Sequence, residues 1–272
     1  MKALLRLVPF SLLILFASSV ALAQGTTTPT PVRLKAPAGG LTTFPVLPPG
    51  PVLTGMPVSY QGSSQQSQTL ADGTRISRKT GTSSFYRDSV GRIRWERSMF
   101  GPGPSRPSPI LDQIEILDPV AGVQYIINPQ KHMAYRYPYA ARPEPERRPP
   151  STPPPLPPPN PDRPQISRQS LGTQVMEGVT VEGQRITTTY PVGYMGNDRP
   201  FSRTCDEWRA PDLRITVLYS CTDPRSGDSE TRLTNIIRSE PDPSVFQVPS
   251  DYTILDGPSD GHLTWTVPSS QP

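Results

Sequence analysis

The stretch 232–254, RLTNIIRSEPDPSVFQVPSDYTI, decides the fold, because a strand pattern ends there in a defined way. Residues 233–238 have the apolar content of a closing strand, and the proline that follows cannot donate to a sheet ladder. Asp242 is suited to cap a single helical turn that carries proline at its first position. We expect that turn to bring Phe246 into the core, and Tyr252 to pack where the chain leaves the sheet.

Upstream of this stretch, short apolar runs alternate with turn signals. In RIRWERS (92–98), Ile93 and Trp95 alternate with charged residues, a pattern typical of a half-buried strand. The preceding DSVG ends in Gly91, which suits the left-handed position of a hairpin loop. Further along, strand runs are expected to break at Glu177-Gly178 and at Glu182-Gly183. Many such strands and no long helical stripe predict a mainly β protein built on a curved antiparallel sheet.

Composition divides the chain into six segments. They are an expected signal peptide at 1–23, a disordered Thr/Pro/Gly-rich arm at 24–57, the first half of the β domain at 58–137, a Pro-rich linker or inserted loop at 138–165, the second half of the β domain at 166–255, and a polar C-terminal tail at 256–272. The two halves could form two small sheets or one continuous sheet. One sheet is favoured, because each half alone has few apolar residues with which to close a core.

The first residues predict export. Lys2 and Arg6 precede an almost wholly apolar run at 7–22, and Ala21-Leu22-Ala23 matches the pattern cleaved by signal peptidase. We expect a cleaved signal peptide and a periplasmic or secreted protein; the alternative is an uncleaved anchor. No cysteine follows the apolar run, so a lipid-modified N-terminus is not expected, and no later segment is apolar enough to span a membrane.

Proline accounts for 38 of the 272 residues, and it is concentrated in segments that cannot all pack into a core. The segment 138–165 is either a surface loop or spacer, or a PxxP-type ligand. Within the polar tail, HLTWTV (262–267) could be a final strand or disordered.

Charge indicates no nucleic-acid partner. The formal net charge of +4 falls to +2 without Lys2 and Arg6, which is close to neutral for this length. Between 72 and 106 basic residues outnumber acidic ones, which fits either a solvated sheet face or a surface for an anionic partner. Aromatic residues are too scarce for a base-stacking platform.

Cys205 and Cys221 are the only two cysteines. In an exported chain this count favours a disulfide, and two buried thiols are the alternative. A turn centred near residues 211–212 would place Cys205 opposite Leu218 or Tyr219, so a disulfide requires a bulge or a wider turn.

No catalytic motif can be assembled. The sequence has no G-x-S-x-G elbow, H-E-x-x-H helix, P-loop or dinucleotide fingerprint. Its two histidines, His132 and His262, are not spaced as metal ligands with the cysteines. We therefore expect no enzyme activity, no catalytic residue, no cofactor and no metal.

Three segments carry a family resemblance: LGTQVMEGVTVEGQRITTTYP (171–191), DEWRAPDL (206–213) and the opening stretch. They resemble uncharacterised exported bacterial proteins that are similar to the LolA-like group of periplasmic lipoprotein- and lipid-binding domains. Trp208 followed by a short turn, and the Phe246–Tyr252 segment, match features of that group. YIINPQKHMAYR (125–136), a strand ending in Asn-Pro before a basic turn, also fits.

The resemblance implies a half-barrel whose concave face holds an acyl chain or a short helix, and it brings no catalytic residues. We expect Ile93, Trp95, Ile126 and Trp208 to line that face. The resulting hypothesis is a non-enzymatic binding protein of the periplasm or cell envelope, with a lipid, an acyl chain or an envelope protein as its partner. The alternative is a structural or interaction protein of the envelope that uses its Pro-rich segments as spacers.

Overall fold

A computed structural model describes residues 41–45, 51–100, 110–140, 160–258 and 262–266, and the side chains of 51–100, 110–140 and 160–258. The expected signal peptide, most of the arm and most of the Pro-rich segment lie outside these ranges. Contacts divide the chain into units 1–36 and 37–272, and every described residue belongs to the second.

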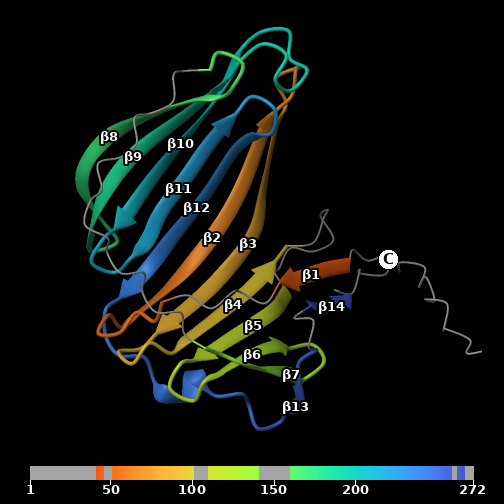
Figure 1. Cartoon of the computed structure of the whole chain (residues 1–272), viewed down its shortest axis with the longest axis vertical. Helices are drawn as coiled ribbons and strands as arrows, with labels where there is room; N and C mark the ends of the chain where they lie inside the picture. Colours follow the sequence, from red (N-terminus) through yellow and green to blue (C-terminus); the bar gives the residue numbers. More distant parts are fainter. Residues whose placement is uncertain (1–40, 46–50, 101–109, 141–159, 259–261, 267–272) are drawn as a thin grey trace, which may run out of the picture. The chain divides into compact units, whose positions relative to one another are not determined.

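The described residues are almost entirely strands (Figure 1). The first half of the domain contributes β2 (Val58–Thr69), β3 (Arg75–Arg87), β4 (Ile93–Met99), β5 (Ile110–Asp118), β6 (Val123–Asn128) and β7 (Met133–Pro138). The second half contributes β8 (Gln165–Met176), β9 (Val179–Tyr190), β10 (Phe201–Ala210), β11 (Ile215–Asp223), β12 (Gly227–Ile237), the 3-10 helix η1 (Pro243–Phe246) and β13 (Thr253–Asp256). A separate pair is formed by β1 (Leu41–Pro45) and β14 (His262–Thr266).

Twelve strands form one curved sheet in the order β13-β7-β6-β5-β4-β3-β2-β12-β11-β10-β9-β8 (Figure 1). All neighbours are antiparallel except β13 and β7, which are parallel. The two halves meet where β12 pairs with β2, so the last long strand of the domain lies beside its first. The prediction of a mainly β, curved antiparallel sheet is confirmed, and the two halves form one sheet.

The order of strands also explains why a long connection is needed between the halves. β7 lies next to one edge of the sheet and β8 forms the other edge. Ten strand spacings separate them, or about 48 Å along the sheet. The connection has 26 residues, 139–164, and a chain of that length can span the distance.

The segment 241–252, here called the latch, packs on one face of the sheet over β4 to β7. Asp242 caps η1 by accepting a hydrogen bond from the Ser244 N–H at 2.8 Å, with proline at the first position. Phe246 is buried, and Val248 and Tyr252 pack against the cluster of Ile114, Ile116, Ile127 and Ala134. The predictions for the capped turn, for Phe246 and for Tyr252 are confirmed.

Two strand predictions need correction or completion. The sequence indicates a break at Glu182-Gly183, but β9 runs through it without interruption. Gly183 serves packing instead, because a Cβ there would lie 2.6 Å from the ring of Trp208. The segment around His262 forms β14, which pairs with a β1 strand inside the arm for which the sequence indicates no periodic structure.

Among the described residues, no helix is long and apolar enough to cross a membrane.

Candidate functional site

A line of side chains crosses five neighbouring strands on one face of the sheet. Antiparallel pairing places Tyr60 opposite Phe85, Phe85 opposite Trp95, Trp95 opposite Glu115, and Glu115 opposite Ile126. Residues paired in this way point to the same face. This set, here called the cross-strand row, spans about 19 Å from β2 to β6 at the usual strand spacing.

The row changes from accessible to buried along its length. Tyr60, Phe85 and Trp95 are half-buried, whereas Glu115 and Ile126 are 4% and 0% exposed. The Tyr60 and Phe85 rings stack with centroids 4.7 Å apart. Burial raises the pKa of Tyr60 to about 12, against the opposing charge of Arg87. The row therefore provides a low-polarity surface that is accessible at its aromatic end.

The structure brings together three of the four residues expected to line the concave face. Trp95 and Ile126 belong to the row, and Ile93 lies on β4 two residues before Trp95, on the same face. Trp208 is elsewhere, on β10, where it covers Gly183.

Trp208 packs against a second cluster, whose buried members are Val58, Val179, Val181, Ala210, Leu213, Ile215, Val217 and Leu233. Tyr60 and Phe85 pack against the same cluster. The aromatic end of the row is therefore continuous with the core around Trp208, although Trp208 is not part of the row.

Buried polar residues flank the row, and sequence reasoning missed them. Arg97 is paired across the strands with Gln113, and its guanidinium lies 4.4 Å from the centroid of the Trp95 ring. Gln124 donates a hydrogen bond of 2.5 Å to Glu115, and an Arg97 nitrogen lies 3.9 Å from the other Glu115 oxygen. Gln113, Glu115 and Gln124 are all at most 4% exposed. We call Arg97, Gln113, Glu115 and Gln124 the polar quartet.

Part of the polar quartet lacks partners. Within the described part of the chain, both amide atoms of Gln113 and Nε of Arg97 are buried and make no hydrogen bond. A buried unpaired polar atom costs about 1–3 kcal/mol, so such groups call for an explanation. In the sequence, Gln113 and Glu115 alternate with isoleucines, a pattern that indicates a strand with one polar face exposed to water. In the structure both faces of β5 are buried, which the alternation alone does not reveal.

Burial raises the pKa of the Glu115 carboxyl above its ordinary value of 4.5, with Arg97 and the Gln124 hydrogen bond opposing the effect. The folded protein therefore retains a proton at pH values where the unfolded chain has lost it. The free energy of unfolding consequently falls as pH rises from about 4.5 through the raised pKa.

We expect Glu115→Gln to remove this loss of stability, since a neutral amide can still accept the bond from Gln124. The stability difference between variant and wild type should favour the variant more at pH 8 than at pH 5, measured by urea unfolding across that range. Asp206→Asn, with unfolding also measured at pH 3, is the control of opposite sign, because the hydrogen bond from Arg185 lowers the pKa of Asp206 and removing that carboxylate costs more above pH 4 than below it. A Glu115→Gln difference that does not change with pH would contradict the assignment.

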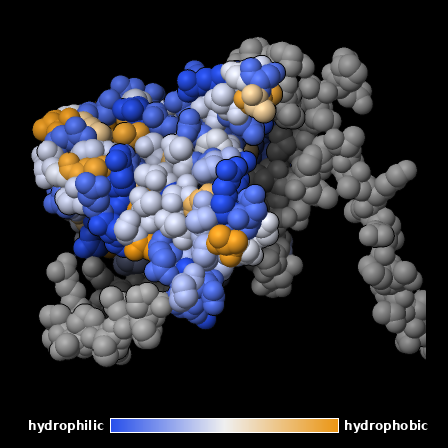
Figure 2. Space-filling model, turned by 90° about the horizontal axis from the view of Figure 1, so that it is seen from above, coloured by the Kyte–Doolittle hydropathy of each residue, from blue (hydrophilic) through white to orange (hydrophobic). Residues whose placement is uncertain are grey.

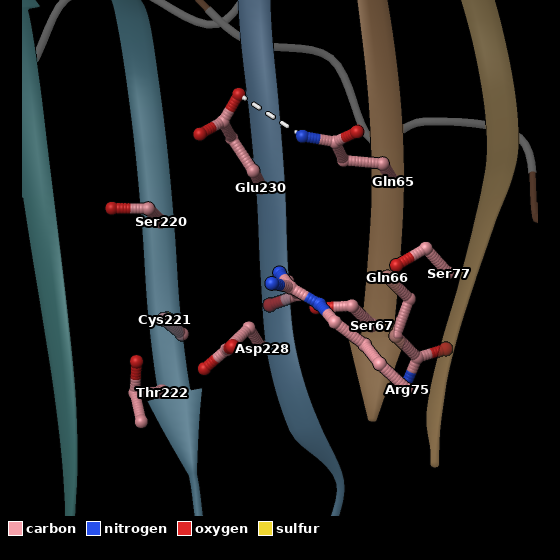
Figure 3. A pocket seen from close by; sticks show the side chains of 11 residues that line it. Gln65, Gln66, Ser67, Arg75, Ser77, Ser220, Cys221, Thr222, Asp228 and Glu230 are labelled. Atoms are coloured by element: carbon pink, nitrogen blue, oxygen red, sulfur yellow. Dashed lines mark hydrogen bonds between the residues drawn. The ribbon is translucent and has the colours of Figure 1, made fainter. Parts of the chain in front are cut away.

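The other end of the sheet is polar. A hollow of about 270 Å³ over β11, β12, β2 and β3 is lined mainly by Ser, Thr, Gln and charged side chains, including Gln65, Arg75, Asp228 and Glu230 (Figure 3). Seen from the end at the top of Figure 1, the described surface is largely hydrophilic, with hydrophobic residues in small separate groups (Figure 2).

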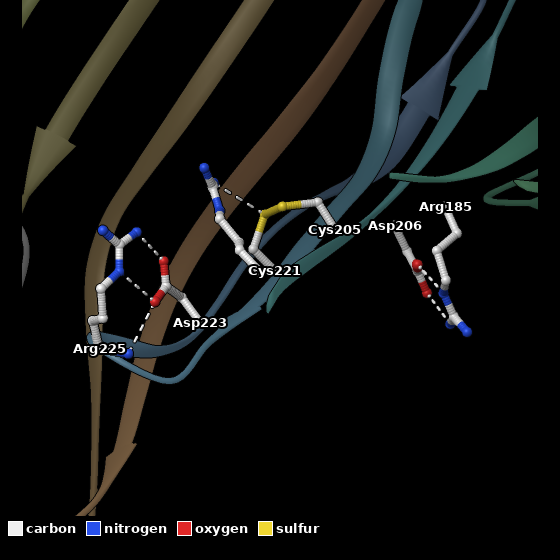
Figure 4. The surroundings of a disulfide bond; sticks show 7 residues. Arg185, Cys205, Asp206, Cys221, Asp223 and Arg225 are labelled. Atoms are coloured by element: carbon white, nitrogen blue, oxygen red, sulfur yellow. Dashed lines mark hydrogen bonds and ion pairs between the residues drawn. A yellow bond between two sulfur atoms is a disulfide. The ribbon is translucent and has the colours of Figure 1, made fainter. Parts of the chain in front are cut away.

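The disulfide prediction is confirmed: Cys205 and Cys221 are bonded directly across β10 and β11 (Figure 4). The hairpin closes at Ala210 and Ile215, and a register shift near Trp208 inserts one extra residue into β11. This wider turn and bulge bring Cys221 opposite Cys205. Arg203 donates a contact of 3.3 Å to the Cys221 sulfur, and the Arg185–Asp206 ion pair lies nearby.

Within the described residues, no three His, Cys, Asp or Glu side chains are grouped so that they could hold a metal ion. The arrangement provides a surface in which apolar side chains lie beside buried hydrogen-bonding groups.

No family model matches the chain, and no curated protein matches it. Solved structures with similar folds include an uncharacterised conserved protein from Thermus thermophilus (8% identity, 73% of this chain and 90% of that chain, TM-score 0.35). Others are lipoprotein LppX from Mycobacterium tuberculosis (11%, 69% and 90%, 0.29) and a LolA superfamily protein from Nitrosomonas europaea (8%, 71% and 90%, 0.26). The likeness to the LolA-like group expected from the sequence thus recurs among solved structures, and it concerns the fold alone.

Proposed function

We propose that this is an exported, non-enzymatic binding protein of the cell envelope that holds an acyl chain of a lipid or lipoprotein against the aromatic end of the cross-strand row. The observation that carries the proposal is the juxtaposition of the aromatic end of the row with unpaired polar atoms. Tyr60, Phe85 and Trp95 offer half-buried apolar surface, and Gln113 with Arg97 lies immediately beside them. An amphiphile matches both parts at once.

The polar end of the ligand is placed by hydrogen bonding. The Gln113 amide offers one acceptor and two donors, and Arg97 Nε offers a further donor. An ester, amide or hydroxyl group can satisfy both kinds, whereas a bare hydrocarbon leaves them unpaired. This favours a headgroup of mixed donors and acceptors over a simple alkane.

Export is supported by two independent features. The first residues have the pattern of a signal peptide, although they lie outside the described part of the chain. The Cys205–Cys221 disulfide is of the kind that persists in oxidising compartments.

The test is acyl binding by delipidated full-chain protein. We expect a fluorescent polyene fatty acid to bind, and unlabelled acyl glycerols to displace it and raise the melting temperature. Trp95→Ala should weaken binding about tenfold, since removing an aromatic contact costs on the order of 1.4 kcal/mol or more.

Tyr86→Ala is the matched control, because Tyr86 lies next to Phe85 on β3 but points to the opposite face. It should leave the affinity unchanged. The proposal fails if no acyl compound raises the melting temperature, or if the Trp95 and Tyr86 variants bind equally well.

A further inference from the structure

Among the described residues, the edge strand β8 has a free side along its whole length. It bonds to β9 on one side only, and no described strand pairs with its other side (Figure 1). All its residues except Leu171 and Met176 are exposed. Its outer backbone N–H and C=O groups therefore form a template for another strand.

β8 lacks most of the features that protect sheet edges. Over twelve residues it carries a single charge, Arg168, and no proline. The opposite edge is different: β13 has only four residues and ends at Asp256. Edges that do not pair are usually short, charged or interrupted by proline. The length and neutrality of β8 therefore favour an edge that is used.

A bulge at the centre of β8 makes the strand self-complementary. The register to β9 shifts between Ser170 and Gly172, so that Leu171 is the extra residue. Because of this shift, Ile166 and Val175 point to the same face, being paired with Thr188 and Thr180 of β9. Without the shift, two residues nine positions apart would point to opposite faces.

Ile166 and Val175 are the most exposed apolar residues of β8, at 61% and 70% exposure. A two-fold axis between Ser170 and Leu171 pairs two antiparallel β8 strands so that Ile166 of one copy lies opposite Val175 of the other, and the reverse. The same register sets Arg168 against Thr173, so no like charges oppose each other.

We propose that a second copy of this chain is the occupant of this edge: two molecules join through β8 in a symmetric pair that continues the sheet from one copy into the other. The interface is isologous, as in most homodimers. It consists of backbone hydrogen bonds and two Ile166–Val175 contacts, one on each side of the axis. This proposal does not rest on acyl binding, because the row lies on β2 to β6, away from β8.

Charge substitution with rescue tests the register as well as the interface. We expect the full-chain protein to show a concentration-dependent monomer–dimer equilibrium by sedimentation. Ile166→Lys with Val175→Lys should leave only monomer, since two lysines then face each other on both sides of the axis. Ile166→Lys with Val175→Glu should restore the dimer in low salt, because each lysine then faces a glutamate.

Cysteine cross-linking provides a second, independent readout. Ser170→Cys lies at the axis and should cross-link to its own counterpart under mild oxidation, whereas Gln174→Cys, on the same exposed strand, lies too far from its counterpart to do so. A wild-type protein that stays monomeric overturns the proposal and leaves the edge to a different protein. A dimer that survives the double-lysine change, or equal cross-linking at both positions, overturns it too.

Discussion

Replacing Arg87 with methionine should destabilise the domain by about 3 to 5 kcal/mol, the largest effect expected of any single side chain described here. Arg87 is 3% exposed at the end of β3. Its guanidinium donates to the carbonyl of Met56 and to the buried carbonyl of Leu213, both at 2.9 Å. Methionine keeps the apolar stem but leaves both carbonyls without this donor.

The two bonds also tie distant parts of the chain together. Met56 precedes β2, and Leu213 lies in the β10–β11 turn, 126 residues from Arg87 in sequence. The Arg87→Met variant should therefore unfold at a lower urea concentration, and the amides of the β10–β11 turn should exchange their hydrogens faster.

Arg185→Met is the control for Arg87→Met. Arg185 makes two shorter bonds, both 2.7 Å, to Asp206. The side chains of that pair are 44% and 23% exposed, so water replaces the lost bonds and the expected cost is below about 1 kcal/mol. Equal losses of stability in the two variants would show that burial does not increase the contribution of the Arg87 hydrogen bonds.

Local chemistry made the strands and the latch predictable. The capped turn at Asp242 and the strand around Trp95 depend on neighbours in sequence, and both elements are found in the structure. The failure at Glu182-Gly183 has a clear cause: glycine also marks places where a ring must approach the backbone, and Trp208, which lies over it, is far away in sequence.

The candidate site was only half predictable. Period-two alternation assigns Ile93 and Trp95 to one face of their strand, whereas Ile126 is expected beside them only from the family resemblance. Gln113 and Glu115 could not be assigned to the site, because alternation separates two faces without saying whether the polar one meets water. Cross-strand register and burial, which make these residues part of the site, arise from the sheet as a whole.

Removing the disulfide by Cys205→Ala with Cys221→Ala should cost about 3 kcal/mol, since the bond closes a loop with a sequence separation of 16 residues in the unfolded chain. For a domain of this size that corresponds to a fall of roughly 10 °C in melting temperature. A reducing agent should lower the melting temperature of the wild type to that of the double variant, and leave the double variant unchanged. The same experiment also tests the fold, because Cys205 and Cys221 lie opposite each other only if the β10–β11 turn is wide and β11 contains the bulge. If the oxidised wild type contained two reactive thiols, or were unaffected by reduction, that hairpin register would be wrong.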